Sequence, residues 1–226
     1  MAKQKGRCVR HRCLLRPYGA LFISILSSIQ DGDAAKTEEL LNGADGAKHM
    51  ANLDKADFLG FRPIEHAIAA GSLEVVEALL SANASTETEA KFDSVLHIAC
   101  DHNEKQAADM VAALIAGGAD VEHPGTGGVT PLYRALSKGN QAAVEVLLEA
   151  GADVDKENDH GVNAVDWAFA LSQRFNNTRL HEVVLQAREK KWAADPALAL
   201  RQEQLDAAAA KVGYVEMDAR DKKPMG

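Results

Sequence analysis

The sequence predicts an all-α protein built as a solenoid of repeated helix-turn-helix units. One complete unit lies between Gly128 and Asp155, where two short amphipathic helices are separated by a glycine. The unit recurs along the chain, since Ala164 lies 33 residues after Pro131 and Pro63 lies 68 residues before it. Two helices of this size bury their apolar faces only against neighbouring copies, so the recurrence predicts a stack of units around one continuous core.

Each element of this unit follows from its residues. Pro131 suits the first position of a helix, and the hydroxyl of Thr130 is expected to cap that helix. Gly139 is expected to end the helix by adopting a positive φ. A second helix with an Ala, Val and Leu face should follow and stop at Gly151.

The motifs GVTPLYRAL, SKG and VEVLLEAGADVD, at this 33-residue period, resemble ankyrin repeats. The resemblance implies about five repeats, of which the first and the last are atypical. Thr37 and Glu38 of the first repeat stand where other repeats have Val, which predicts a terminal repeat with a polar outer side. The last repeat carries the insertion RFNNT before its second helix. The repeats begin near Leu21, Gly60, Ser94, Gly128 and Gly161.

The third repeat departs from the others in its middle, which is three residues longer. Asn103 or a neighbour is expected to make the turn that glycine makes elsewhere. His97 occupies the place where ankyrin repeats have a histidine that hydrogen-bonds to neighbouring loops, so the resemblance implies a structural role. Cys100 falls at a position where a small buried side chain is expected.

A further helix is expected after the repeats. Asp195 and Pro196 mark a helix start, Gly213 marks its end, and Leu198 and Leu205 lie seven residues apart on a narrow apolar seam. We expect this helix to cap the open end of the fifth repeat; the alternative is that it binds a foreign helix. The expected organisation is a basic arm (1–19), the ankyrin-repeat domain (20–191), the C-terminal helix (192–213) and a polar tail (214–226).

Charge is distributed unevenly along the chain. The formal net charge is −8 at pH 7, but the first 30 residues contain six cations and no acid, which leaves −14 for the remainder. Such a basic arm is a candidate for contact with RNA or another anionic surface in a large assembly. The six cations are Lys3, Lys5, Arg7, Arg10, Arg12 and Arg16.

The same arm bears on location. An acid-free basic stretch followed by the apolar run from Leu21 to Leu26 is also compatible with a mitochondrial targeting peptide, although the repeat register assigns that run to the first helix. The run is far shorter than a membrane span. The three cysteines predict no disulfide framework and favour a reducing compartment. We therefore expect a cytoplasmic protein, with a mitochondrial location as the alternative.

No residue pattern indicates catalysis, a metal or a cofactor. Cys8, His11 and Cys13 lack a fourth ligand and the paired spacing of zinc sites. The run GTGG lacks the Lys-Ser/Thr of a phosphate-binding loop. No Ser or Cys nucleophile is placed beside His160 or His181. The sequence therefore predicts a protein that is not an enzyme and that binds no cofactor.

The ankyrin resemblance implies protein binding on a concave surface made of loop tips and the exposed sides of the first helices. The expected function is that of an adaptor, scaffold or accessory subunit of a larger complex. The tip residues expected to contact a partner are Phe58, Leu59, Phe61, Lys91, Asp93, Thr126, Val129, Asp159, His160 and Val162. The helix residues are Ala69, Ala70, Asp101, His102, Ser137 and Lys138.

One of these tips is unusual because Phe58, Leu59 and Phe61 place three large apolar groups where water is expected. Clustered exposed apolar side chains mark interaction sites. The alternative is that they fold onto the inserted connection around Lys48 to Leu53 and hold it in place.

Overall fold

A computed structural model describes residues 19–57, 60–87, 93–175 and 178–194, and the statements below refer to these residues. The chain divides into two compact units after Val184. The described part of the second unit, residues 185–194, is the continuation of one helix. Regular structure in the described ranges is helical and contains no strand. The predicted all-α class is therefore confirmed.

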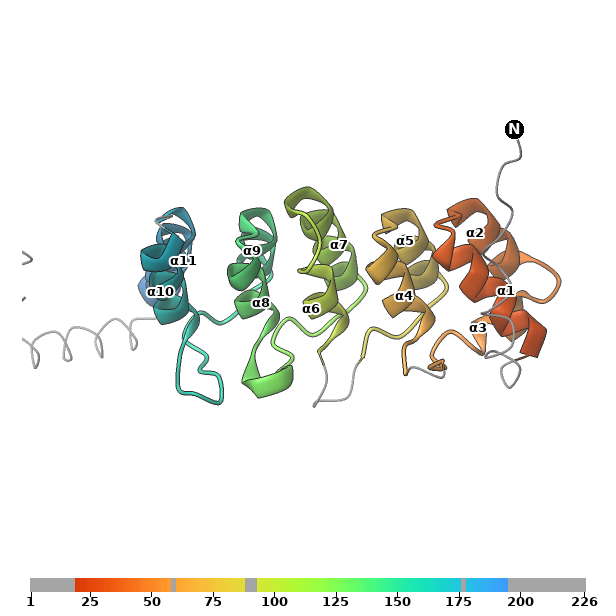
Figure 1. The fold of residues 1–226 in the computed structure, drawn as a ribbon, viewed down its shortest axis with the longest axis horizontal. Coiled ribbons are helices and arrows are strands. Elements are labelled where there is room, and N and C mark those ends of the chain that lie inside the picture. The colour runs from red at the N-terminus through yellow and green to blue at the C-terminus, as the bar shows by residue number, and fades with distance from the viewer. Residues whose placement is uncertain (1–18, 58–59, 88–92, 176–177, 195–226) are drawn as a thin grey trace, which may run out of the picture. The chain divides into compact units, whose positions relative to one another are not determined.

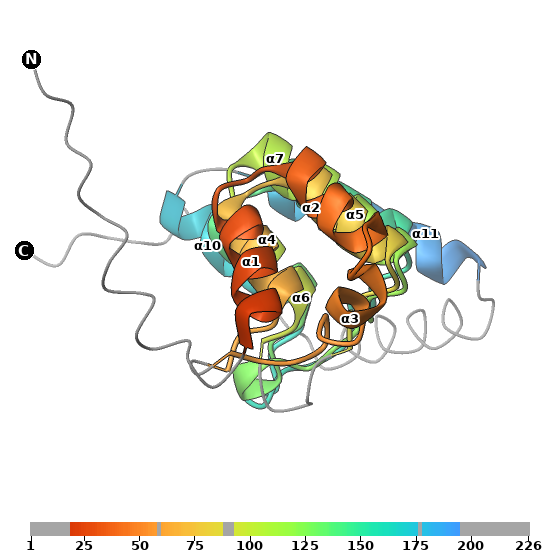
Figure 2. The same ribbon diagram turned by 90° about the vertical axis from the view of Figure 1, so that its right-hand side faces the viewer.

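The first unit is a succession of helix pairs (Figure 1). The first helices of the pairs are α1 (Gly19–Gln30), α4 (Pro63–Ala70), α6 (Val95–Ala99), α8 (Pro131–Lys138) and α10 (Ala164–Phe175). The second helices are α2 (Ala34–Asn42), α5 (Leu73–Ser81), α7 (Glu104–Ala116), α9 (Gln141–Glu149) and the part of α11 (Arg179–Ala194) up to Val184. Each first helix contacts the first helix of the next pair, and α2, α5, α7 and α9 contact one another in the same order. The first helices thus form one layer and the second helices another. The loops that connect one pair to the next lie along one edge of these layers (Figures 1 and 2).

Proline and glycine set the ends of these helices, as the sequence predicts. Pro131 is the first residue of α8, and Gly139 ends it with a φ of 72°. The predicted hydroxyl cap is wrong, because the side chain of Thr130 accepts no capping hydrogen bond. Thr130 is only 1% exposed and has extended backbone, so its side chain packs inside the loop while the fixed φ of Pro131 starts the helix.

The core runs from pair to pair through equivalent helix positions. Ile68 of α4, Cys100 directly after α6 and Leu136 of α8 occupy the same place in successive repeats, and each is at most 1% exposed. The equivalent residue of α10, Phe169, is 51% exposed. Among the described residues no further first helix follows α10. Burial at this position therefore comes from the next repeat in the stack.

Burial gives Cys100 a specific chemical behaviour. Its thiol lies 3.7 Å from the carbonyl oxygen of Pro131, and burial raises its pKa to about 12. The reactive thiolate is therefore scarce in the native state. In a Cys8→Ser/Cys13→Ser variant, a thiol reagent should label Cys100 slowly in native buffer and rapidly in urea. Labelling is measured by the absorbance of the thiol that the reagent releases. Fast labelling of the native variant would contradict this burial.

The first repeat differs from its predicted arrangement. Thr37 is fully buried, and its hydroxyl donates to the Asp33 carbonyl at 2.8 Å and lies 3.1 Å from the Ser28 hydroxyl. The expectation that Thr37 belongs to a polar outer side is therefore wrong, while Glu38 is exposed as expected. Thr37 replaces Val in the core because the neighbouring Ser28 and the helix backbone satisfy its hydroxyl.

The long connection after the first repeat forms a short helix, α3 (Gly46–Met50), which contacts α1 and α2. Within it His49 is 2% exposed, and Leu53 just after it is also 2% exposed. The buried side chains of His49 and Leu53 thus anchor the insertion.

Two details of the later repeats concern helix ends. Asn103 precedes α7 and accepts a hydrogen bond from the Gln106 N–H at 3.2 Å, so it caps the second helix of the third repeat. Helix α11 continues to Ala194, past the expected end of the repeats at residue 191. The expected C-terminal helix from Pro196 to Val212, the polar tail and the basic arm lie outside the described residues.

Candidate protein-binding surface

The candidate surface consists of the exposed sides of α4, α6, α8 and α10 together with the loop that precedes each of them. We call it the first-helix surface, and each loop the tip of the helix that follows it. In Figure 1 the tips lie along the lower edge of the helix pairs. The four tips are residues 54–62, 85–94, 120–130 and 153–163, of which 58–59 and 88–92 are not described.

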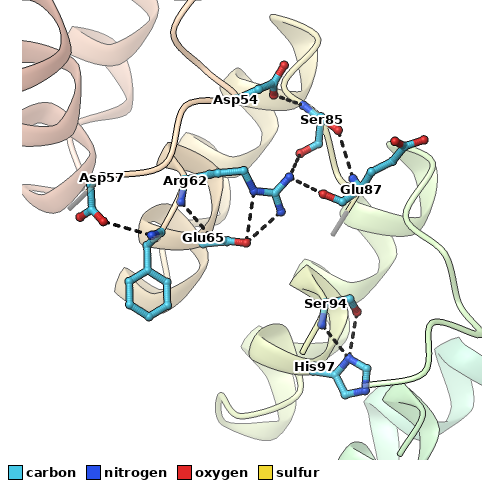
Figure 3. A network of polar contacts seen from close by, with 9 residues as sticks. Asp54, Asp57, Arg62, Glu65, Ser85, Glu87, Ser94 and His97 are labelled. Atoms are coloured by element: carbon cyan, nitrogen blue, oxygen red, sulfur yellow. Dashed lines mark hydrogen bonds and ion pairs between the residues drawn. The ribbon is translucent and has the colours of Figure 1, made fainter. Parts of the chain in front are cut away.

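Arg62 ties the α4 tip to the α6 tip (Figure 3). Its guanidinium donates twice to Glu65 Oε1, at 3.2 and 2.8 Å, and also to the carbonyl oxygens of Ser85, at 3.3 Å, and Glu87. Glu65 in turn accepts from the Arg62 backbone N–H at 2.7 Å. The side chains of this ion pair are only 13% and 9% exposed. One charged residue thus fixes the backbone of two neighbouring tips.

The α4 tip is also held by two aspartates. Asp54 accepts from the Ser85 N–H at 2.8 Å, and Asp57 accepts from the Phe61 N–H at 3.0 Å (Figure 3). Asp57 also lies 2.9 Å from His66 Nε2. The Phe61 side chain is 46% exposed and meets the His66 ring edge-on, with centroids 5.8 Å apart. For Phe61 the structure therefore supports the exposed alternative.

His97 links the α6 tip to the α8 tip. Its Nε2 lies 2.8 Å from the Val129 carbonyl oxygen, and its Nδ1 accepts from the Ser94 N–H at 3.0 Å. With Nδ1 accepting, Nε2 carries the proton and donates to Val129. The predicted structural role of His97 is confirmed. Burial lowers the pKa of His97, and the Val129 hydrogen bond and the Asp93 charge offset only part of that effect.

The lowered pKa of His97 makes stability depend on pH. Between the folded pKa and the ordinary value near 6.5, the unfolded chain binds more protons at this residue, so stability rises with pH in that window. We expect the His97 contribution to be lost as the solution is acidified from pH 7.5 to pH 5. Urea unfolding should show a steeper acid loss for the wild type than for His97→Gln, which keeps an N–H donor without a titrating ring. Equal slopes would contradict the assignment.

Two acids that flank α6 and two cations of α8 form a chain of ion pairs. Arg134 pairs with Asp93 and lies 3.9 Å from Asp101, which pairs with Lys138 at 3.1 Å. Burial raises the pKa of Asp93, but the hydrogen bond from the Thr126 N–H and the charge of Arg134 outweigh it, and the pKa is lowered. Two cations and two acids balance, so this part of the first-helix surface carries little net charge.

Tyr133 and Lys156 hold the α10 tip. The Tyr133 hydroxyl donates to the Val162 carbonyl, and Lys156 donates to the Glu122 carbonyl at 2.7 Å and pairs with its carboxylate at 3.1 Å. Tyr133, His97 and Glu65 occupy the same position in successive first helices. His97 and Tyr133 bond directly to the next tip from this position, whereas Glu65 acts through Arg62, whose guanidinium donates to it and to the next tip.

The structure places most of the predicted contact residues that it describes on the first-helix surface, whereas Asp101 and His102 lie in the turn after α6. Ala69, Ala70, Asp101, Thr126, Ser137, Lys138, Asp159 and His160 are exposed, and Asp93, His102, Val129 and Val162 are half-buried. Val129 and Val162 also serve as backbone acceptors for neighbouring repeats. Phe58, Leu59, Lys91 and the six cations of the arm lie outside the described residues.

Sequence reasoning missed part of this surface. Arg134 and Trp167 occupy equivalent positions of α8 and α10, and both are half-buried on the same side as the predicted helix residues. The Trp167 indole N–H donates to the Ser137 hydroxyl at 3.0 Å. The repeat register predicts where each first helix starts, and both residues lie three positions after that start. The register could therefore have identified Arg134 and Trp167 as surface residues.

A small pocket opens between α8 and α10. Its volume is about 240 Å³. It is lined by Leu136, Ser137, Lys138, Gly139, Ala168, Leu171 and Leu180.

Within the described ranges, no group of three His, Cys, Asp or Glu side chains is arranged to hold a metal ion. None of the described helices combines the length and hydropathy needed to cross a membrane.

Comparison with known proteins agrees with this architecture. A family model described as ankyrin repeats matches three copies over residues 66–158. Ankyrin repeats generally mediate protein–protein interaction, and the family is a non-enzymatic interaction module.

The relatives themselves are diverse. Human ankyrin repeat and SOCS box protein 11 is 33% identical over 111 residues, which cover 49% of this chain and 33% of that protein. The potassium channel AKT1 of Arabidopsis thaliana is 35% identical over 72 residues, covering 32% of this chain and 8% of the channel. The mouse B-cell lymphoma 3 protein homolog is 30% identical over 95 residues, covering 41% and 21%. The chain spans about a third or less of the length of these relatives.

Proposed function

Because the chain is an ankyrin-repeat protein, we propose that it is a non-enzymatic adaptor or accessory subunit whose first-helix surface, the concave surface of ankyrin repeats, binds a protein partner within a larger assembly. The observation that supports this most is the fixed geometry of the tips. Side chains of one repeat hold the backbone of the next tip at three successive junctions, through Arg62, His97 and Tyr133.

Such fixation matters for affinity. A surface that is ordered before binding loses less conformational entropy when a partner docks, so more of the contact energy appears as affinity. The exposed residues between the held tips are small or mutually paired, as at Ala69, Ala70 and the Asp101–Lys138 pair. Small side chains leave room for a partner to approach the helices closely.

The experiment that tests this proposal is site-specific photo-crosslinking. A photoreactive amino acid is introduced at Ala70 or Ala170 on first helices, and at Ala112 or Ala116 on α7 as controls; all four residues are exposed. Irradiation in lysate of the source cells should give discrete adducts with one protein from the first two sites. Adducts of that protein from the α7 sites alone would overturn the proposal.

A second candidate function concerns the basic arm. The six cations without an acid in residues 1–30 favour an RNA- or anionic-surface-anchored assembly component. Counterion release makes such binding salt-dependent, so deleting residues 1–16 should flatten the salt dependence of binding to RNA homopolymers. An unchanged slope would count against the arm as the anchor.

A further inference from the structure

We propose that the pocket between α8 and α10 receives one large apolar side chain from a protein partner, and that the same partner segment places basic residues about four positions away against the α10 tip. This inference rests on the proposed function, because it names the part of the first-helix surface that provides the anchor and the chemistry of the partner. Both walls of the pocket belong to the first compact unit.

The pocket has a cause in the sequence. Gly139 ends α8 with a positive φ after 8 residues, whereas Ser172 occupies the equivalent position of α10 and lets that helix continue for 12 residues to Phe175. Helix α11 therefore begins later, at Arg179, than the glycine-turned second helices do. The space that opens at the end of α8 is lined by Leu136, Leu171 and Leu180 among others.

Size and chemistry favour a single apolar side chain. The volume of about 240 Å³ is below the 300–1,000 Å³ of typical small-molecule sites, and exceeds the ~150 Å³ of an apolar cavity that holds benzene. The two polar side chains in the wall already have partners, since Ser137 accepts from Trp167 and Lys138 pairs with Asp101. An apolar group can therefore enter without leaving either of them unsatisfied.

The neighbouring tip is acidic. Glu157 and Asp159 of the α10 tip and Asp166 in the first turn of α10 are exposed, while Lys156 in the same tip is paired with Glu122. Burial is the main cause that raises the pKa of Tyr133 to about 12, and the charges of Asp166 and Glu157 add to it. Charge complementarity then favours a basic partner segment.

The spacing follows from the helix geometry. The pocket lies at the C-terminal end of α8, and the tips lie at the N-terminal ends of α8 and α10. The 8 residues of α8 span about 12 Å at 1.5 Å per residue. An extended segment advances about 3.3 Å per residue, so roughly four residues separate the apolar anchor from the basic residues.

The test is selection of displayed random dodecapeptides on the full chain, with matched variants for analysis. Enriched peptides should share an aliphatic or aromatic residue with Lys or Arg about four positions away. Leu171→Arg and Leu171→Ala should weaken them about tenfold or more, as expected for loss of one buried apolar side chain. Ala112→Arg, at an exposed position of α7 outside the first-helix surface, should leave the affinity unchanged. Circular dichroism verifies that each variant is folded.

A second readout is local to the pocket. In a Trp192→Phe background, the emission of Trp167 should shift when an enriched peptide binds, because Trp167 is bonded to Ser137 of the pocket wall. Asp159→Lys combined with Asp166→Lys should weaken binding, more at low salt than at high salt.

Three outcomes would overturn the inference. The enriched peptides could share acidic residues, or they could bind Leu171→Arg as tightly as the wild type. The third outcome is a dimer that depends on Leu171 in sedimentation velocity, which would make a second copy the occupant. Peptides that depend on Ala70 but not on Leu171 would refute the pocket while leaving the proposed function in place. If the photoreactive sites at Ala70 and Ala170 give no adducts in lysate while the selected peptides still bind the pocket, the proposed function is refuted instead.

Discussion

Replacing Arg62 with alanine is expected to lower the free energy of unfolding by about 3–5 kcal/mol. The change leaves the Glu65 carboxylate, whose side chain is only 9% exposed, without its cation, and breaking one partner of a buried pair has a cost of this order. The carbonyl oxygens of Ser85 and Glu87 lose their donor at the same time. Urea unfolding followed by far-ultraviolet circular dichroism measures the change.

The matched control is the double variant Arg62→Met/Glu65→Leu, which removes both charges and keeps apolar volume. It should be more stable than Arg62→Ala alone, because no buried charge remains unpaired. If Arg62→Ala has an effect below about 1 kcal/mol, the pair behaves as an exposed surface salt bridge, and the tip would not depend on it.

Replacing Ile68 with alanine is expected to lower the free energy of unfolding by about 2–5 kcal/mol. The reason is that Ile68, in α4, is fully buried. Phe169→Ala, at the equivalent position of α10, should lower it by only ~1 kcal/mol, although phenylalanine is larger. Phe169 is 51% exposed, so only about half of its burial energy is at stake. The same unfolding assay compares the two.

The comparison tests the stacking of the repeats. If Phe169→Ala is as destabilising as Ile68→Ala, the outer side of α10 is covered as fully as the inner repeats are, and the last described first helix is not the end of the apolar stack. Folding of each variant in the absence of urea is checked by circular dichroism.

The fold followed from features that repeat locally. Proline at the start and glycine at the end of α8, and the 33-residue recurrence, specify helix pairs and their order without any knowledge of contacts. The role of His97 was predictable from the ankyrin resemblance, because the repeat register places it where those repeats have a histidine that hydrogen-bonds to neighbouring loops. Cys100 was likewise placed in the core by its position in the helix.

The connections between repeats were not predictable in the same way. Arg62 reaches carbonyl oxygens 23 and 25 residues away, and Tyr133 reaches one 29 residues away, through side chains that differ from repeat to repeat. The burial of Thr37 depends on its contact with Ser28, which only the packed first repeat reveals.

The pocket is an intermediate case. Ser172 in place of a turn glycine was visible in the sequence and indicates a longer α10. The sequence could not show that the extra length leaves a cavity beside Leu136, because that depends on where α11 begins. The predicted contact residues Ser137 and Lys138 turned out to line it.

The measurement that tests the central claim most directly is affinity purification from source-cell lysate with two matched double variants. Ala70→Arg/Ala170→Arg places two cations on the first-helix surface, and Ala112→Arg/Ala116→Arg places two on α7; all four alanines are exposed. The account predicts that a stoichiometric protein recovered with the wild type is lost from the first variant and retained by the second, at both low and high salt. Retention by the first variant and loss from the second would contradict it.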